Sequence, residues 1–219
     1  MARICGPILG FRGLEGDVWR LTILVAHDNG TAPGTLAHGE QGRPPDSEVE
    51  PSSLGEAGGA TFFGYAFGIP RQDAERTVVY GFVGEERRWT FSVPGRLQAP
   101  RIAYASCNGF SMPGDMRRIA DKNALWNGLG TIHASQPFHL LLMGGDQIYA
   151  DELWDVVPDL RRFNERPRSE RVAMVPDPSL QGALERFYID VYRDRFSQPP
   201  VAEALASMPS IMMWDDHDI

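Results

Sequence analysis

The sequence predicts an α/β protein in two parts: an antiparallel β sandwich in residues 1–97 and a mixed α/β region in residues 98–219. Two observations support this division. Before residue 100, apolar and polar residues alternate in short segments bounded by turn residues, which is the pattern of half-buried strands. After residue 100, short uninterrupted apolar segments are separated by amphipathic ones, which is the order of strands and helices in a layered, mainly parallel sheet.

Composition and charge narrow the classes of function. The chain has 219 residues, 42% hydrophobic and 23% charged, enough for a substantial core in one large domain or two small ones. Its formal net charge is -8, and its basic residues form only short pairs such as Arg87-Arg88. This charge disfavours binding to long nucleic acids or anionic membranes. A small phosphorylated substrate remains compatible with it, because bound cations can invert the local charge.

Cysteine content and hydropathy indicate a reducing compartment. Two cysteines, Cys5 and Cys107, are too few for a disulfide framework, and two reduced thiols are expected rather than one bridge between them. Residues 1–14 contain no apolar run typical of a signal peptide, and no segment has the roughly 18 apolar residues of a membrane span. A cytoplasmic location with no membrane span is therefore predicted.

Four strands are predicted in the first part. Residues 17–26 and 88–93 alternate clearly between apolar and polar side chains, and residues 61–67 and 76–83 do so more weakly. Residues 84–86 form the turn before the last of these strands. Short antiparallel strands joined by turns are typical of a small β sandwich.

Residues 28–59 are predicted to form a long mobile loop within this part. The segment is rich in Gly, Pro, Ser and Glu and nearly lacks large apolar residues, so it has little surface to bury. His27 and His38, at its start and within it, are expected to be solvated rather than to bind a ligand.

The second part alternates between strands and helices. Its three apolar runs are predicted to be parallel strands covered on both faces. The predicted strands are residues 102–106, 140–143 and 211–214, and the predicted helices are residues 119–133, 178–196 and 201–207.

The helix at residues 178–196 has the strongest support. Its apolar residues, from Leu180 to Tyr192, recur at spacings of three and four and form one stripe. Asp177 is a typical N-cap residue, and Pro178 suits the first turn. The aromatic residues of the stripe are therefore predicted to pack in the core.

Polar groups able to bind a metal follow all three predicted parallel strands. The first strand end carries Cys107 and Asn108. A thiolate is a strong, soft ligand whose pKa falls when it binds a metal. The ordinary alternative for a single cysteine is a small buried core residue.

The second strand end reads Gly145-Asp146-Gln147-Ile148-Tyr149. The glycine lets the chain turn sharply, and one carboxylate, Asp146, could bridge two cations. Tyr149 lies three residues later and could supply a hard phenolate ligand. The alternative is a plain turn with a capping Asp and a packed Tyr, but the spacing of Tyr149 and the nearby Asp151 favour a metal site.

The third strand end reads Asp215-Asp216-His217-Asp218. Three carboxylates beside one imidazole would repel one another unless a cation neutralised them. The alternative is a helix N-cap with a solvated acidic face. We predict His217 to be a proton donor or a contact to the transition state, with Asp218 orienting its ring.

These motifs together resemble the alkaline phosphatase D (PhoD-like) branch of the calcineurin-like metallophosphoesterases. The resemblance rests on the Ala-Ser-Cys strand end, then Gly-Asp-Gln-Ile-Tyr-Ala-Asp, then Trp-Asp-Asp-His-Asp, in that order. The opening Gly-Pro-Ile-Leu-Gly-Phe-Arg-Gly and the following Trp-containing strand are similar to that family's N-terminal β domain. The resemblance thus extends over the whole chain.

The resemblance implies a four-layered α/β/β/α metallophosphoesterase domain that hydrolyses phosphomonoesters or phosphodiesters at a two-metal centre. It assigns Cys107 and Tyr149 to iron, Asp146 to a bridging position and Asp216 to a position where the wider superfamily has a metal-binding Asn. His217 matches the histidine that contacts the phosphate or leaving group. The expected ions are iron with calcium, or else Mn, Zn or Mg. Asn108 and Asp215, beside the ligands, are the predicted substrate contacts.

The sequence also departs from the family pattern. Members of the family continue beyond the Asp-Asp-His-Asp motif into further His and Asp ligands, and four predicted ligands are few for two metal ions. We therefore expect an N-terminal fragment of a phosphoesterase with weak or no activity of its own. The alternatives are a noncatalytic β-sandwich binding module with a structural metal ion, and an unrelated metal-dependent hydrolase with convergent acidic motifs.

Overall fold

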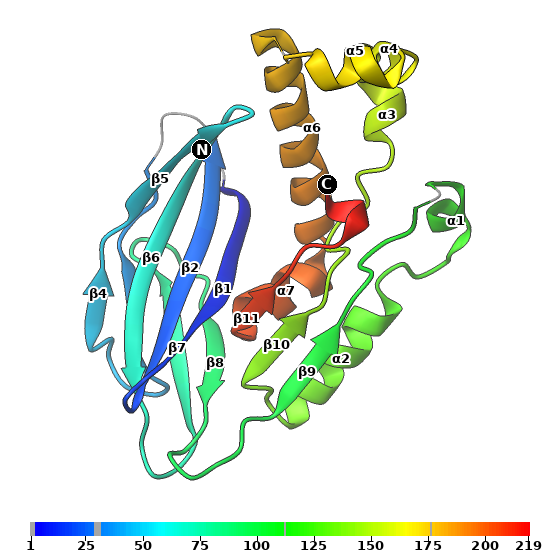
Figure 1. The fold of residues 1–219 in the computed structure, drawn as a ribbon. Coiled ribbons are helices and arrows are strands. Elements are labelled where there is room, and N and C mark those ends of the chain that lie inside the picture. The colour runs from blue at the N-terminus through cyan, green and yellow to red at the C-terminus, as the bar shows by residue number, and fades with distance from the viewer. Residues whose placement is uncertain (1–2, 29–31, 112, 176) are drawn as a thin grey trace.

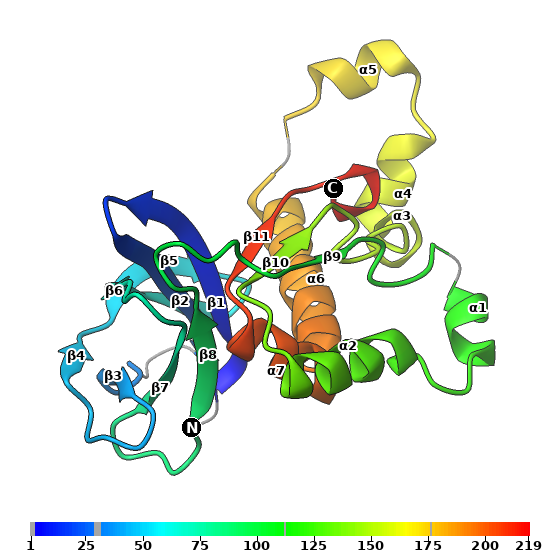
Figure 2. The same cartoon turned by 90° about the horizontal axis from the view of Figure 1, so that it is seen from below.

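The computed structural model describes residues 3–28, 32–111, 113–175 and 177–219. Over these residues the chain is a mixed α/β protein with two sheets, one of seven strands in the order β5-β6-β2-β1-β11-β10-β9 and one of four in the order β4-β3-β7-β8. Figures 1 and 2 show the β-rich part on one side and the helices gathered around β9, β10 and β11 on the other.

The predicted strands and helices are found close to their expected positions, except that the helix expected at residues 119–133 begins only at residue 124. The described strands are β1 (Arg3–Glu15), β2 (Val18–Asp28), β3 (Leu36–Glu40), β4 (Ser47–Val49), β5 (Ser52–Ala57), β6 (Ala60–Pro70), β7 (Arg76–Phe82), β8 (Trp89–Val93), β9 (Ile102–Ala105), β10 (Leu140–Met143) and β11 (Ser210–Met212). The described helices are α1 (Pro113–Arg118), α2 (Ala124–Ser135), α3 (Leu153–Val156), α4 (Pro158–Asn164), α5 (Arg168–Ala173), α6 (Pro178–Phe196), α7 (Pro199–Ser207) and the 3₁₀ turn η1 (Asp216–Asp218).

The core of the N-terminal part lies between the two sheets. Alternate residues of β2 point into it, and β6 pairs antiparallel with β2 along its whole length, from Val18 opposite Pro70 to Asp28 opposite Ala60. Apolar side chains from both sheets form one buried cluster. Because successive side chains of a strand point to opposite faces, every second residue can pack in this cluster while the backbone hydrogen bonds between strands stay intact.

The expectation of one long loop at residues 28–59 is wrong. In its described residues, β3 pairs with β7, β4 pairs with β3, and β5 pairs with β6; residues 29–31 lie outside the described part. β5 is almost entirely exposed and β4 largely so, which explains their polar composition. Such segments have no apolar pattern of their own, and their backbone hydrogen bonds to a neighbouring strand stabilise them as strands.

The expectation that His27 and His38 are solvated is also wrong, since each residue is only 6% exposed. His27 continues the inward-facing stripe of β2, two residues after Val25. His38 stacks on Phe67 with ring centroids 4.8 Å apart. Burial lowers the pKa of both imidazoles, because it disfavours the charged form.

The strands β9, β10 and β11 pair in parallel within the large sheet, with Met143 of β10 opposite Ala105 and Met212. Apolar residues of α2, α6 and α7 pack on one face of these strands. The prediction that both faces are covered is wrong in this structure: Tyr104 is 71% exposed and Ile211 is 45% exposed. Sequence could not distinguish these cases, because an apolar run is compatible with either.

The two predicted parts of the chain share the large sheet. β1 pairs antiparallel with β2 and also lies parallel to β11, where Gly10 is opposite Ser210. The buried Tyr80 hydroxyl donates to the Ala206 carbonyl oxygen at 2.7 Å, which joins β7 to α7. The strand ends that carry the candidate site are therefore anchored on the β-rich part.

The helix predicted at residues 178–196 is confirmed as α6. Asp177 accepts a hydrogen bond from the Leu180 amide at 2.8 Å, as expected of an N-cap residue. The apolar stripe packs against the short helices α3 and α4. These two helices and α5 were not predicted, because each is too short to show a helical period.

Candidate metal centre at the parallel strand ends

Three loops meet at the carboxyl ends of the parallel strands. Each follows one strand: Cys107 lies two residues after β9, Asp146 three after β10, and Asp216 four after β11. The first two loops are held together by backbone hydrogen bonds from the Cys107 amide to the Gly145 carbonyl at 3.1 Å and from the Asn108 amide to the Asp146 carbonyl at 2.7 Å. Parallel pairing thus brings residues far apart in sequence to one edge of the sheet.

Two of the predicted ligands have left-handed backbone conformations. The φ angle is 60° at Cys107 and 52° at Asp146, and these are the only non-glycine residues with positive φ in the described part. Such conformations cost of order 1–3 kcal/mol each and persist where surrounding contacts impose them, often at functional sites. Both residues take part in the hydrogen bonds that join the two loops.

Asp146 is the centre of the cluster. Its Oδ2 atom accepts hydrogen bonds from the Cys107 thiol and the Tyr149 hydroxyl, each at 3.3 Å. Its Oδ1 atom is buried and has no hydrogen-bond partner among the described residues. Because a buried carboxylate oxygen is costly to leave unpaired, this atom is suited to a cation.

Asp216 and His217 complete the cluster. One ligand atom each from Asp146, Asp216 and His217 lie within 4.8 Å of one another. Carboxylate, imidazole, thiol and phenol groups are all metal ligands once deprotonated. The four predicted ligands, Cys107, Asp146, Tyr149 and Asp216, are thus brought to one place with donors that fit a metal ion.

The surroundings of Tyr149 favour its neutral phenol. Burial raises its pKa well above the usual range, and the hydrogen bonds to Cys107 and Asp146 and the charges of these groups act in the same direction. A nearby cation acts in the opposite direction, because it favours the phenolate. Tyr149 could therefore bind a metal only if that metal displaced its proton.

His217 is held by Asp151. Its Nδ1 atom lies 2.9 Å from a carboxylate oxygen of Asp151, and its ring packs against Tyr149 with centroids 4.5 Å apart. Desolvation lowers the pKa of His217, but the hydrogen bond and charge of Asp151, with Asp216 and Asp146, outweigh this and raise it. The contact leaves Nε2 as the ring nitrogen available to a substrate.

The same three strand ends carry a sequence signature found in known proteins. Residues 77–219 match a family described as PhoD related phosphatase, and this range includes all three motifs. The chain belongs to this PhoD-related phosphatase family. The chain is also 28% identical over 174 residues to "Uncharacterized protein YGR266W" of Saccharomyces cerevisiae, a match that covers 72% of this chain and 24% of that protein. The chain therefore spans about a quarter of the length of this relative.

Membership in the PhoD-related phosphatase family confirms the resemblance stated from the motifs. The matched range also contains the cluster of Asp146, Asp216 and His217. The match begins at β7, so β1 to β6 lie outside it. Within the described residues, no helix is both long and apolar enough to cross a membrane.

Asp218 does not orient the His217 ring as predicted. Its buried carboxylate instead accepts hydrogen bonds from the Ile148 and Asp215 amides, both at 3.0 Å. The Asp215 bond is one half of a capping box at η1, and in the other half the Asp218 amide donates to the Asp215 side chain. The Asp215 carboxylate also accepts from the Asp216 amide at 3.0 Å. Asp218 thus fixes the backbone that presents Asp216 and His217, and Asp151 takes the orienting position.

Asp215 and Asn108, the predicted substrate contacts, are both engaged with the protein. Asp215 packs against Gly145, where a Cβ atom would lie 2.6 Å from the Asp215 Cβ. Asn108 is buried, and its Oδ1 atom accepts from the Trp126 indole at 2.8 Å and from the Arg195 guanidinium at 2.6 Å. Their roles as substrate contacts stay predictions.

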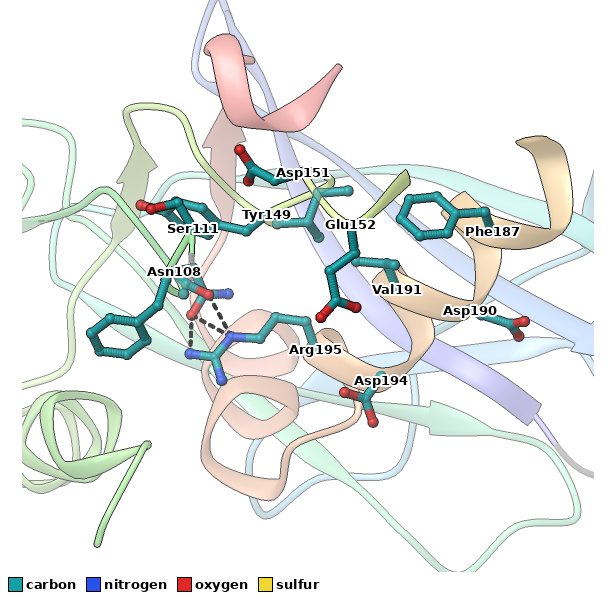
Figure 3. Close-up of a pocket in the computed structure, with 13 residues that line it drawn as sticks. Asn108, Ser111, Tyr149, Asp151, Glu152, Phe187, Asp190, Val191, Asp194 and Arg195 are labelled. Atoms are coloured by element: carbon teal, nitrogen blue, oxygen red, sulfur yellow. Dashed lines mark hydrogen bonds between the residues drawn. The ribbon is translucent and has the colours of Figure 1, made fainter. Parts of the chain in front are cut away.

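Sequence reasoning missed Arg195 and Trp126. Both reach the β9 loop from helices, α6 and α2, and only the tertiary structure brings them to Asn108. Figure 3 shows the Arg195 guanidinium bonded to Asn108, in a pocket that Tyr149 also lines. Burial lowers the pKa of Arg195, although it stays charged because an ordinary guanidinium titrates far above neutral pH.

Proposed function

We propose that this chain provides the metal-binding half of a phosphoesterase that hydrolyses phosphomonoesters or phosphodiesters at a two-metal centre. The observation that carries the proposal is the environment of Asp146, whose buried Oδ1 lacks a partner while Oδ2 is shared by Cys107 and Tyr149. Family membership supports the reaction class. The proposed architecture is a four-layered α/β/β/α domain behind a β sandwich.

The donor set of this chain suggests which metals would bind. Thiolate and phenolate ligands, from Cys107 and Tyr149, suit iron, whereas the carboxylates of Asp146 and Asp216 also suit hard ions such as calcium. We propose iron with calcium, and Mn, Zn or Mg as substitutes. The bound cations would neutralise charge on the phosphoryl oxygens and activate water as the nucleophile.

The remaining groups position and protonate the substrate. Asp151 holds His217 at Nδ1, so the Nε2 atom of His217 can donate a proton to the leaving oxygen. The raised pKa of His217 keeps a larger fraction of the ring protonated near neutral pH. Asp218 supports this arrangement through the backbone of η1.

The number of ligands implies that the 219-residue chain turns over slowly or not at all. Cys107, Asp146, Tyr149 and Asp216 are four predicted ligands for two ions, whereas each metal ion in a protein takes about four to eight. A longer form of the protein would supply the others. The whole protein spans more than this chain if it resembles its yeast relative in length.

Hydrolysis of p-nitrophenyl phosphate and bis(p-nitrophenyl) phosphate tests the proposal. We expect chelator-sensitive activity from the longest natural form of the protein, loss of that activity in Asp146→Asn, and little activity from the 219-residue chain. Robust hydrolysis by the short chain would contradict the proposed half-site. No hydrolysis by the long form with any of the named metals would contradict the phosphoesterase assignment and favour a noncatalytic module with a structural ion.

A further inference from the structure

A pocket of about 360 Å³ adjoins the candidate metal centre. The loops after β9 and β10 form one side, and residues 187–195 of α6 form the other (Figure 3). Tyr149 and Asp151 line the pocket and also belong to the centre, since Tyr149 bonds to Asp146 and Asp151 holds His217. A phosphoester bound at the centre would therefore extend one of its organic groups into this pocket.

The charge of the pocket is mainly negative. Four carboxylates line it, from Asp151, Glu152, Asp190 and Asp194, against one guanidinium, from Arg195. Arg195 directs its side chain to the backbone carbonyl and the amide oxygen of Asn108, so its hydrogen bonds are used inside the protein.

Two of these carboxylates are available to a ligand. Asp151 is engaged with His217, and Asp190 pairs with Arg193 at 2.6 Å. Glu152 and Asp194 make no close ion pair with any described residue, although the charge of Asp194 acts on Arg195 beside it. Figure 3 shows the Glu152 side chain extending into the pocket toward α6, with Asp194 along the helix at its rim.

The other walls are apolar and aromatic. Phe187 and Val191 of α6 face Tyr149 and the buried Ile148 across the pocket. Carboxylates beside aromatic rings suit an organic cation, because the rings attract positive charge and bury the attached methyl or methylene groups. The same carboxylates would repel an anionic group such as a further phosphate.

We propose that this pocket binds the positively charged group of an amino-alcohol or quaternary-ammonium phosphoester, with Glu152 and Asp194 as the residues that select it. The inference rests on the proposed function, because the pocket opens beside the centre where the phosphate would bind. It narrows the substrate class to phosphoesters that carry a cationic alcohol.

Binding of choline and of 3,3-dimethylbutan-1-ol, its neutral isostere, to the 219-residue chain tests this inference without turnover. We expect choline to bind about tenfold more tightly in ligand-observed NMR titrations, the range that a desolvated cation over aromatic rings supports. Glu152→Gln should remove most of this preference, and Glu152→Gln with Asp194→Asn nearly all of it. Glu48→Gln, on the exposed strand β4, is the matched control and should leave it unchanged.

Equal binding of the two alcohols, binding of neither, or an unchanged preference in Glu152→Gln would overturn the inference. These results are independent of the hydrolysis assay. A long form that hydrolyses nitrophenyl esters but shows no preference for choline would retain the proposed function and refute the pocket assignment. Choline selectivity that depends on Glu152, in a protein without phosphoesterase activity, would support cation binding by the pocket and refute the proposed function.

Discussion

Asp151 holds His217 by a carboxylate contact of 2.9 Å to Nδ1, although the two residues are 66 positions apart in the sequence. Two other acidic residues of the same turn bond to backbone amides instead. Asp218 is buried and bonded to two backbone amides, and Asp215 caps the turn. The orientation of the imidazole thus depends on the loop after β10.

Replacing Asp151 with alanine should change the tautomer of His217. A carboxylate at Nδ1 favours the proton on that nitrogen, whereas a free imidazole prefers the proton on Nε2. We expect long-range proton–nitrogen NMR correlations of the His217 ring to show a shift from the Nδ1-H to the Nε2-H tautomer in Asp151→Ala. An unchanged tautomer would show that another group orients the ring.

Replacing Asp218 with alanine should destabilise the fold without changing that tautomer. The substitution leaves the Ile148 and Asp215 amides without their acceptor, at a cost of about 1–3 kcal/mol. Chemical denaturation measures the loss in unfolding free energy. Asp216→Ala is the control, because its exposed carboxylate has no hydrogen bond to the described protein and its loss should change stability little. Equal stability of Asp218→Ala and Asp216→Ala would contradict the capping role.

A methyl group at Gly145 should disrupt the centre. Gly145 has a φ angle of 115°, and an added Cβ would lie 2.6 Å from the Asp215 Cβ. We expect Gly145→Ala to lower the free energy of unfolding by about 1–3 kcal/mol. Gly128→Ala, in α2 where an added Cβ meets nothing within 4 Å, should instead raise it by about 0.5–1 kcal/mol. Thermal melts of the two variants test this difference: the melting temperature should fall in Gly145→Ala and rise in Gly128→Ala. A similar change of melting temperature in both variants would contradict the prediction.

The ion pair between Glu75 and Arg101 should make the free energy of unfolding depend on pH below about pH 4.5. The hydrogen bond from Arg101 lowers the pKa of Glu75 from 4.5 to about 2. Because the folded pKa lies below the unfolded one, the pair contributes stability above about pH 4.5 and loses it as the pH falls toward 2. Glu75→Gln should therefore be less stable than the wild type at pH 6, and the difference should shrink between pH 4.5 and 2. Urea midpoints across this range measure it, and a constant difference would refute the linkage.

Several features could be predicted from sequence because they depend on local patterns. The stripe of α6, its Asp177 cap, and the apolar runs of β9, β10 and β11 are examples. The grouping of Cys107, Asp146, Tyr149 and Asp216 followed from parallel strands ending at one edge. These inferences needed only periodicity, capping chemistry and the geometry of a parallel sheet.

Other features depended on contacts that sequence patterns do not reveal. The polar strands β4 and β5 form because β3 and β6 offer them hydrogen bonds. The Asp151–His217 pair requires two loops to meet, and adjacency in the chain pointed to Asp218 instead. The inward-facing residues of β2 alternate up to Val25, and His27 is the next position of this alternation. The burial of His27 could therefore have been predicted from the sequence.

Metal content after dialysis against iron and calcium, followed by elemental analysis, tests the central claim most directly. We predict that the wild-type chain retains iron with a visible charge-transfer band from Cys107 or Tyr149, and that Asp146→Asn loses most of it. Asp155→Asn, which removes an exposed carboxylate from α3, should retain iron like the wild type. A wild-type chain without bound metal, or an Asp146→Asn variant that binds as much as the wild type, would contradict a metal centre at Asp146.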